Sequence, residues 1–326
     1  MRALLPHLVS AALALVAVTG AARAETGFVT VDDGVKLFYE REGSGPAIVV
    51  PLHLFTYEWL RPLSDKWTVI GYDVRNRGRS QHLETLDTIT IQQDVADLET
   101  LRRHIGLEKM DLVGHSYTGL MVYLYAAAYP DRVGRIVQLG PIPPVFGAKY
   151  RAAYVYTDDV AGEADMAPIY KLRDAGLREK EPERYCLAVW KVLSRMLVGD
   201  ASHVSRLHDM DKKACKLPNE WPQNFNRHLE HQLPSIQNLV LKREDLGKFQ
   251  TPVLTIHGTR DRNAAYGGGR DWAYLLPNAR LITIEGAAHA AYAERPDIVT
   301  PAIRTFLGGH WPTDAIRVTE SPLEAG

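Results

Sequence analysis

The chain has 326 residues, which suits one large α/β domain with an elaboration, or two ordinary domains. A hydrophobic fraction of 46% and a charged fraction of 24% are typical of a folded globular protein and exclude a disordered chain. The formal net charge of -1 gives no electrostatic reason to expect nucleic acid or an anionic membrane surface as a partner.

The N-terminus has the pattern of an export leader. Arg2 supplies the positive end, residues 8–18 form an apolar run, and residues 22–24 place alanine at both positions that a signal peptidase inspects. A transmembrane anchor is the alternative, but the apolar run is shorter than the roughly 20 residues that span a bilayer. Cleavage after Ala24 would leave Glu25 as the first residue of an exported protein, periplasmic or secreted, without a stable membrane anchor.

The two cysteines, Cys186 and Cys215, both lie in the middle of the chain. In an oxidising compartment they could form one disulfide, which would stabilise the fold by roughly 3 kcal/mol. Two separate buried thiols are the alternative. Export favours the disulfide.

After the leader, short apolar runs alternate with helical patterns, which predicts a mostly parallel sheet flanked by helices. Residues 28–31 and 35–39 flank the turn sequence DDG and are expected to form a hairpin. Apolar residues recur on one face of residues 91–105, which indicates a helix that Gly106 ends. Further strands are expected at residues 47–52, 67–72, 110–113, 135–139, 252–256 and 280–284, and further helices at residues 120–129 and 298–307.

A long stretch after the sixth expected strand contains no β pattern and is rich in charged and aromatic residues. Its near-helical spacings predict a small helical subdomain, because a structureless loop of that length is implausible in a compact protein. We expect this subdomain to be a cap over the site. The predicted organisation is a leader (1–24), a first core segment (25–141), a helical cap (142–248) and a second core segment (249–326).

Residues 112–119 read LVGHSYTG where an expected strand meets an expected helix. Such a turn lifts the Ser116 hydroxyl into the cleft at the positive end of a helix, and the backbone N–H of Tyr117 would face a developing oxyanion. A nucleophilic serine needs a base and an orienting carboxylate, which in this type of fold follow in the order serine, acid, histidine. Asp261 and His289 each follow an expected strand in that order. We therefore predict Ser116 as nucleophile, His289 as general base and Asp261 as orienting acid.

These features resemble the α/β-hydrolase superfamily, and within it the capped branch of proline-iminopeptidase-like and esterase-like enzymes. The resemblance includes DDGVKL at residues 32–37, DVRNRGRS at 73–80, GTRD at 258–261 and ERP at 294–296. It implies an α/β-hydrolase fold, with the cap inserted after the sixth strand and no cofactor. It also implies that the Phe55 N–H is the second oxyanion donor. Leu54 stands where the family usually has glycine, and Thr118 stands at the last position of the usual G-x-S-x-G motif.

Several other polar residues have structural explanations. By resemblance, Asp73, Arg75 and Ser80 brace a loop, and His115 is expected to pack and not to act as a base. The pair His228 and His231 has no third ligand, so no metal site is expected.

The acidic residues Glu179, Glu181 and Glu183 have two possible explanations. They form either a solvated face of the cap or a site for the amine of a substrate.

We expect an exported serine hydrolase that cleaves a small carboxylic ester or amide through an acyl-Ser116 intermediate. The alternatives are a proline-iminopeptidase-like aminopeptidase, a cofactor-free perhydrolase or carbon–carbon hydrolase with the same triad, and a non-catalytic binding protein on the same scaffold. Epoxide-hydrolase and dehalogenase chemistry is disfavoured, because those relatives have aspartate where Ser116 stands. A cap that roofs the pocket favours a small molecule or a short peptide as substrate.

Overall fold

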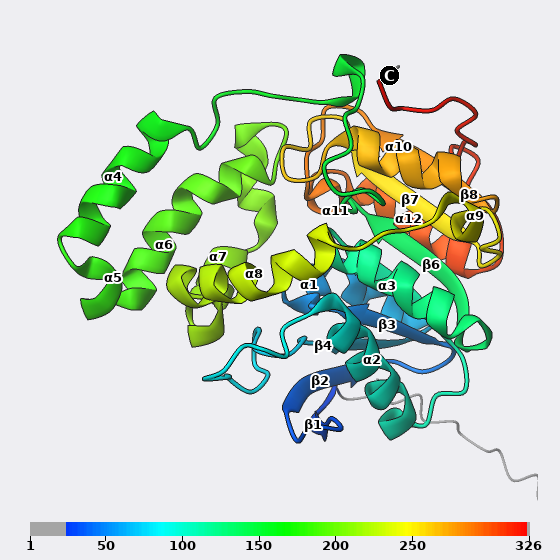
Figure 1. The fold of residues 1–326 in the computed structure, drawn as a ribbon, viewed down its shortest axis with the longest axis horizontal. Coiled ribbons are helices and arrows are strands. Elements are labelled where there is room, and N and C mark those ends of the chain that lie inside the picture. Colours follow the sequence, from blue (N-terminus) through cyan, green and yellow to red (C-terminus); the bar gives the residue numbers. More distant parts are fainter. Residues whose placement is uncertain (1–23, 325–326) are drawn as a thin grey trace, which may run out of the picture.

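The computed structural model describes residues 24–324, and the predicted leader lies outside this range except for Ala24. Its centre is an eight-stranded sheet in the order β1-β2-β4-β3-β5-β6-β7-β8 (Figure 1). The β1–β2 and β2–β4 pairs are antiparallel, and the other neighbours are parallel. The strands are β1 (Glu25–Thr30), β2 (Lys36–Glu42), β3 (Ala47–Pro51), β4 (Thr68–Tyr72), β5 (Met110–His115), β6 (Val133–Leu139), β7 (Val253–Gly258) and β8 (Ala279–Ile284). Each corresponds to a strand expected from the sequence.

Helices cover both faces of this sheet, which is why the central strands are apolar along their whole length. One face packs against α2 (Ile91–Ile105), α3 (Tyr117–Ala128) and α10 (Tyr266–Leu275). The other packs against α1 (Tyr57–Leu60), α11 (Ala291–Glu294) and α12 (Pro296–Leu307).

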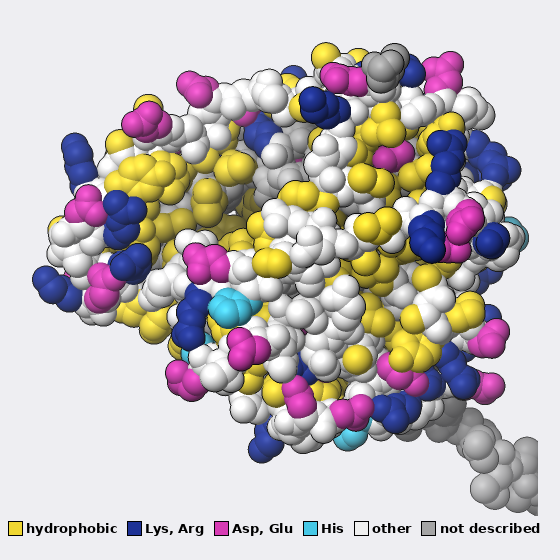
Figure 2. Space-filling view, in the orientation of Figure 1, with side chains coloured by type: hydrophobic (Ala, Val, Ile, Leu, Met, Phe, Trp, Pro, Cys, Tyr) yellow, Lys and Arg dark blue, Asp and Glu magenta, His cyan; other side chains and the backbone are white. Residues whose placement is uncertain are grey.

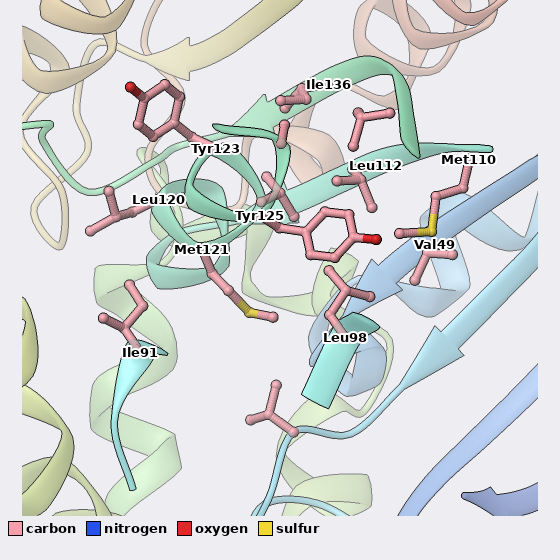
Figure 3. Close-up of a cluster of buried hydrophobic side chains, with 14 of the residues drawn as sticks. Val49, Ile91, Leu98, Met110, Leu112, Leu120, Met121, Tyr123, Tyr125 and Ile136 are labelled. Atoms are coloured by element: carbon pink, nitrogen blue, oxygen red, sulfur yellow. The ribbon is translucent and has the colours of Figure 1, made fainter. Parts of the chain in front are cut away.

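Helix α3 is buried on nearly all sides, as its apolar sequence predicts. Figure 3 shows Leu120, Met121 and Tyr125 of this helix among side chains of β5, β6 and α2. The helix that begins next to Ser116 is therefore held by the central core of the protein.

A helical insertion, residues 142–248, lies between β6 and β7. Its helices α4, α5 and α6 project away from the sheet, and α8 returns to it (Figure 1). The helices are α4 (Glu163–Asp174), α5 (Leu177–Lys180), α6 (Pro182–Leu193), α7 (Met210–Cys215), α8 (Pro222–Gln237) and α9 (Arg243–Leu246).

A buried ion pair fastens the insertion to the loop after β4. Arg77 donates two hydrogen bonds to the Glu220 carboxylate, at 2.9 and 2.7 Å, and the backbone N–H of Gly78 donates a third at 2.7 Å. Both side chains are buried. Loss of one partner from such a pair typically costs about 3–5 kcal/mol, because the other charge stays buried without compensation.

The insertion also packs closely on the loops after β7 and β8. Arg262 donates to the carbonyl oxygen of Val198 at 2.9 Å. A Cβ atom at Gly199 would lie only 1.8 Å from the carbonyl oxygen of Gly286, so the two backbones touch at a position that only glycine permits. All these loops leave the carboxyl ends of strands, which is the edge where sites lie in open α/β sheets.

The segment after α12 runs along the outer edge of the sheet. Ile316 and Leu281 exchange two backbone hydrogen bonds of 2.9 Å, which adds a short bridge to β8. Further on, Tyr150 at the start of the insertion pairs with Leu323. No helix within residues 24–324 is both long and apolar enough to cross a membrane.

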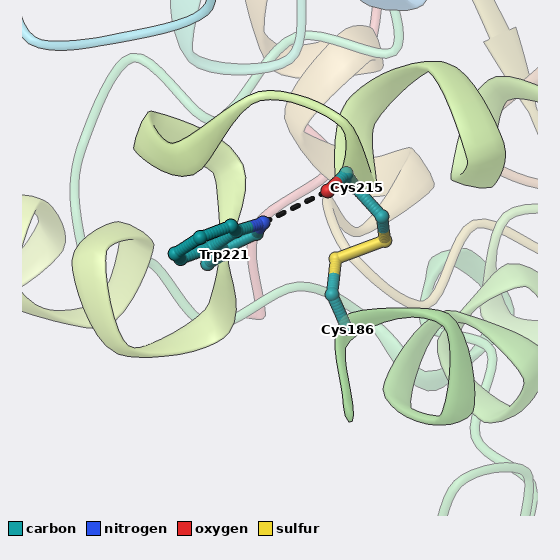
Figure 4. The surroundings of a disulfide bond; sticks show 3 residues. All are labelled: Cys186, Cys215 and Trp221. Atoms are coloured by element: carbon teal, nitrogen blue, oxygen red, sulfur yellow. Dashed lines mark hydrogen bonds between the residues drawn. A yellow bond between two sulfur atoms is a disulfide. The ribbon is translucent and has the colours of Figure 1, made fainter. Parts of the chain in front are cut away.

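A disulfide joins Cys186 of α6 to Cys215 of α7, with Cα atoms 5.6 Å apart (Figure 4). Both cysteines are buried. The Trp221 indole N–H donates to the carbonyl oxygen of Cys215 at 2.8 Å and packs beside the bridge. The bridge therefore links α6, one of the projecting helices, to α7, which precedes α8 in the chain.

Replacing both cysteines by serine is expected to destabilise the insertion by roughly 3–4 kcal/mol, because a loop of this length loses its constraint in the unfolded chain. The sequence separation is 29 residues. Urea unfolding of the double variant beside the wild-type protein measures the loss, with the exposed Ser205→Ala as a control. Two alkylated thiols in the unreduced wild-type protein would contradict the prediction.

Candidate active site

Ser116 lies in a strained turn between β5 and α3. Its backbone angles are φ 55° and ψ -122°, a positive-φ conformation that is unusual for a residue other than glycine. Such a residue typically stores about 1–3 kcal/mol of strain, so the surroundings must hold it in place. The Ser116 N–H donates to the carbonyl oxygen of Leu139 at 3.0 Å, which ties the turn to the end of β6.

The serine turn, residues 114–119, is closed by the threonine that departs from the usual motif. The Thr118 hydroxyl accepts from the His115 N–H at 2.8 Å and donates to the His115 carbonyl oxygen at 2.9 Å. A Cβ at Gly114 would lie 2.4 Å from the Thr118 carbonyl oxygen, so the first glycine is required by close approach. Thr118 therefore supports the turn and does not disrupt it.

Asp261 and His289 form a buried hydrogen-bonded pair. The Asp261 Oδ2 atom lies 2.7 Å from the Nδ1 atom of His289, and its Oδ1 atom accepts from the backbone N–H groups of Asn263 and Ala264. Because a carboxylate is the partner of Nδ1, the neutral ring carries its proton there, and its Nε2 atom is left able to accept a proton.

The charge of Asp261 is stabilised although its side chain is buried. Burial alone would raise the pKa of this carboxyl, but the nearby His289 and the hydrogen bonds from His257 and His289 hold it well below its usual value. His257, which the sequence analysis did not single out, donates its Nε2–H to Asp261 at 3.1 Å and to the Ala264 carbonyl oxygen at 2.9 Å. Asp261 is therefore ionised at neutral pH.

The backbone at the end of β6 brings the serine turn and this pair together. A Cβ at Gly140 would lie 3.1 Å from Asp261 Oδ2 and 3.3 Å from His289 Nδ1, while the preceding Leu139 bonds to Ser116. In the described part of the chain, no hydrogen bond joins the Ser116 hydroxyl to the His289 ring. Such bonds often tighten only when substrate is bound.

His115 packs on the predicted base. Its ring lies 4.5 Å from the His289 ring, centroid to centroid, and its Nε2–H donates to the His289 carbonyl oxygen at 3.2 Å. Burial, together with the charge of His289, lowers the pKa of His115 to about 3, so its ring is neutral. The sequence-based expectation that His115 packs agrees with this position.

The predicted second oxyanion donor, Phe55, ends the 3-10 helix η1 (His53–Phe55). The residue of this turn with a positive φ is Leu52, at 51°, and not Leu54, so glycine is not needed at position 54. The Tyr292 hydroxyl donates to the Phe55 carbonyl oxygen at 3.1 Å. Tyr117, the other predicted donor, is the first residue of α3, where backbone N–H groups lack a partner within the helix.

The insertion reaches this oxyanion turn. The Trp190 ring of α6 lies 6.0 Å from the Phe55 ring, centroid to centroid. A cavity of about 420 Å³ lies between the core and the insertion; Leu54 lines it, but Ser116, Asp261 and His289 do not. Figure 2 also shows a hollow between the core and the projecting part of the insertion, bordered by hydrophobic side chains.

The remaining sequence candidates lie outside the site. Arg75 binds Asp97 at 2.8 Å and Asp33 at 2.9 Å, and the Ser80 hydroxyl donates to the Asp73 carbonyl oxygen, so these residues brace a loop. Among residues 24–324, no group of three or more His, Cys, Asp or Glu side chains is arranged to hold a metal.

The three acidic residues of the insertion face solvent. Glu179 is paired with Arg178, and Glu181 with Arg184; the side chains of these glutamates are 57% and 52% exposed. Glu183 is exposed as well.

Two family models match the chain, one for the alpha/beta hydrolase fold over residues 51–168 and one for TAP-like proteins over residues 230–315. The bifunctional esterase/perhydrolase DCH of Acinetobacter calcoaceticus is 23% identical over 306 residues, covering 86% of this chain and 99% of that protein. The non-heme chloroperoxidase of Streptomyces lividans is 27% identical over 301 residues, with the same two coverages. A solved 2-hydroxy-6-oxo-6-phenylhexa-2,4-dienoate hydrolase from Rhodococcus sp. strain RHA1 superposes with a TM-score of 0.67 at 19% identity, covering 88% of this chain and 100% of that one. With the sheet order and the serine turn, these matches identify the chain as a member of the α/β-hydrolase superfamily.

Proposed function

We propose that this hydrolase cleaves a small carboxylic ester through an acyl-Ser116 intermediate. The observation that carries the proposal is the buried Asp261–His289 hydrogen bond of 2.7 Å beside a serine held in a strained strand-to-helix turn. A serine, its base and an orienting acid in this relation are the requirements of nucleophilic acyl transfer. Membership of the superfamily and a relative named as an esterase support the same chemistry.

In the first half of the reaction, the Ser116 Oγ atom bonds to the ester carbonyl carbon and gives its proton to His289 Nε2. The carbonyl oxygen becomes an oxyanion that accepts hydrogen bonds from the Tyr117 and Phe55 N–H groups, and one such donor is worth about 2.7–4 kcal/mol. The ester C–O bond then breaks, and His289 gives the proton to the departing alcohol.

In the second half, water attacks the acyl carbon while His289 takes one of its protons. The bond to Ser116 Oγ breaks, the proton returns to that oxygen, and the carboxylic acid leaves. Asp261 remains ionised throughout and holds the His289 ring in the required tautomer.

The outward position of Glu179, Glu181 and Glu183 favours an ester over the amine-bearing substrate of an aminopeptidase. A site that binds a substrate ammonium needs a carboxylate directed into the pocket. Glu179 and Glu181 pair with the neighbouring arginines Arg178 and Arg184 instead.

The name of one relative, a bifunctional esterase/perhydrolase, favours one second candidate, a perhydrolase. In that reaction hydrogen peroxide replaces water in the second half: its oxygen bonds to the acyl carbon, Ser116 Oγ leaves with the proton carried by His289, and a peracid is released. Ser116, His289, Asp261 and the two oxyanion donors would have the same roles in this reaction as in ester hydrolysis.

We also propose that the protein is exported after cleavage of residues 1–24. The Cys186–Cys215 disulfide supports an oxidising compartment, because such bonds are rare in reducing ones.

Ser116→Ala is expected to abolish labelling by a fluorophosphonate and to lower kcat by about 10⁴-fold or more, because the acyl-enzyme can no longer form. Intact mass spectrometry detects the label, and Ser205→Ala, an exposed serine of the insertion, should keep it. Persistent labelling of Ser116→Ala would place the nucleophile elsewhere.

Uncharged short-chain nitrophenyl esters are expected to be cleaved faster than aminoacyl nitroanilides, proline included, because Glu179, Glu181 and Glu183, the carboxylates considered for binding the amine, all face solvent. Glu181→Gln and Glu183→Gln should leave both rates unchanged. Faster cleavage of the aminoacyl substrates, with a loss in either glutamine variant, would establish the aminopeptidase instead.

Expression of the full chain in a bacterium with an export pathway is expected to yield a protein that begins at Glu25. N-terminal sequencing of the periplasmic and culture fractions checks this. Recovery of an uncleaved chain from the membrane fraction would show that the apolar run is an anchor.

A further inference from the structure

The buried carboxyl group of Asp94 has no part in the chemistry proposed above, yet it bonds to the serine turn. Asp94 lies in the first turn of α2 and is 1% exposed. Its Oδ2 atom accepts a hydrogen bond from the Tyr117 hydroxyl and a second, of 3.2 Å, from Gln232 Nε2. One carboxylate oxygen therefore joins α2, the residue next to Ser116, and helix α8 of the insertion.

We propose that Asp94 is a positioning residue: it fixes Tyr117, the oxyanion donor beside Ser116, and couples that donor to helix α8. The inference rests on the proposed function, because it concerns how well the Tyr117 N–H is aimed. A donor stabilises an oxyanion only within about 2.7–3.1 Å of the position where the charge develops. Anchoring the Tyr117 side chain to α2 restricts rotation of the residue that carries this donor.

Helix α8 contacts the same turn of α2 a second time. The Ser235 hydroxyl accepts from the Ile91 N–H at 3.0 Å and donates to the Gln232 carbonyl oxygen at 2.7 Å. Gln232 and Ser235 are three residues apart on α8, and Ile91 and Asp94 are three apart on α2, so each pair lies on one helix face. A displacement of α8 therefore reaches Asp94, and through it Tyr117.

Charged and polar groups from several elements lie around the Asp94 carboxyl, whose Oδ2 atom takes both hydrogen bonds while its Oδ1 atom is buried without a hydrogen-bond partner among the described residues. Burial, and then the negative charge of Asp97, raise its pKa to about 7, although the Tyr117 hydrogen bond, Arg75 and Gln232 act in the opposite direction. His228 on α8 is neutral, because burial lowers its pKa to about 3. The groups that face this cluster are Tyr72 from β4, Arg75 and Arg77 from the following loop, Asp97 from α2, Tyr117 from α3, and His228 and Gln232 from α8.

The protonation state of Asp94 determines how the effect of Asp94→Asn on kcat should change with pH. The ionised carboxyl holds the Tyr117 hydroxyl by a charge-assisted bond, which is about twice as strong as a neutral one. Asp94→Asn imitates the protonated form. The ratio of wild-type to Asp94→Asn kcat is therefore expected to rise from near one at pH 5.5 to about tenfold at pH 8.5. Any other pH dependence that the two proteins share cancels in this ratio.

The folding stability of the wild-type protein relative to Asp94→Asn is expected to fall with rising pH, whereas the kcat ratio rises. The folded-state pKa of Asp94 lies above its ordinary value, so the stability of the wild-type protein relative to Asp94→Asn is greatest at low pH. This extra stability of the wild-type protein is lost as the pH rises through about 7, where Asp94 ionises in the folded state. A purely structural role would make activity and stability fall together.

The experiment compares Asp94→Asn, Tyr117→Phe and their double variant with two matched controls. Tyr125→Phe is the first control, because Tyr125 lies on the same helix and donates to Glu99 of α2 at 2.8 Å, away from Ser116. Asp111→Asn is the second, because Asp111 is a buried carboxyl near the opposite end of β5, with a pKa that burial also raises. Gln232→Leu tests the link to α8.

At pH 8.5, Asp94→Asn and Tyr117→Phe should each lower kcat about tenfold while KM stays within about twofold, and the double variant should be no slower than either. Gln232→Leu should lower kcat less, and the two controls should leave kcat unchanged. Equal ratios at pH 5.5 and 8.5, or kcat losses in the controls that match their loss of stability, would overturn the inference.

Fluorophosphonate labelling separates this inference from the proposed function. The labelling rate of Ser116 should fall in Asp94→Asn by the same factor as kcat. Labelling that persists in Ser116→Ala refutes the proposed function, and this inference with it. Wild-type and Asp94→Asn rates that agree at every pH, with Ser116→Ala inert, refute the inference alone.

Discussion

The strained, positive-φ backbone of Ser116 is the constraint on which the rest of the site depends. A strained residue of this kind persists only where its surroundings specify it from several directions. Here the Leu139 carbonyl oxygen receives the Ser116 N–H, and the Thr118 hydroxyl binds both backbone groups of His115. The helix that follows is buried on nearly all sides, so the turn cannot relax without moving the core.

Close contact between backbones sets the distances around this turn. Gly140 leaves room for the Asp261–His289 pair, and Gly199 lets the insertion rest on the loop that precedes His289. A methyl group at either position would meet atoms within 3.1 or 1.8 Å. At these two glycines the chain segments approach one another without an intervening side chain, which helps residues far apart in the sequence to keep a fixed geometry.

Local patterns were sufficient to predict the strands of the sheet and to place Ser116, Asp261 and His289 after strands, because apolar runs and strand-to-helix turns are properties of short segments. The polar links between segments were not predictable in this way. Asp94 and Gln232 are 138 positions apart, and Arg77 and Glu220 are 143 apart. No local pattern distinguishes such a carboxylate or amide from one that faces solvent.

Local sequence patterns were equally insufficient to explain Leu54, which departs from the family motif, and to orient the acidic residues of the insertion. Leu54 replaces a glycine, but the left-handed residue of that turn is Leu52, which only the backbone angles reveal. The direction in which Glu179, Glu181 and Glu183 point depends on how α5 and α6 pack, and the spacing of charges alone is compatible with either direction.

The short bridge between Ile316 and Leu281 has a consequence for how copies of this chain meet. Strand β8 is the last strand of the sheet, and an uncovered outer strand presents free N–H and C=O groups to which another chain can add. The segment that carries Ile316 occupies part of that edge, and its continuation also holds Tyr150, where the insertion begins. Proteolytic trimming of this segment would therefore uncover a sheet edge to which another chain can add, and in the same event it would remove the backbone bridge at Tyr150.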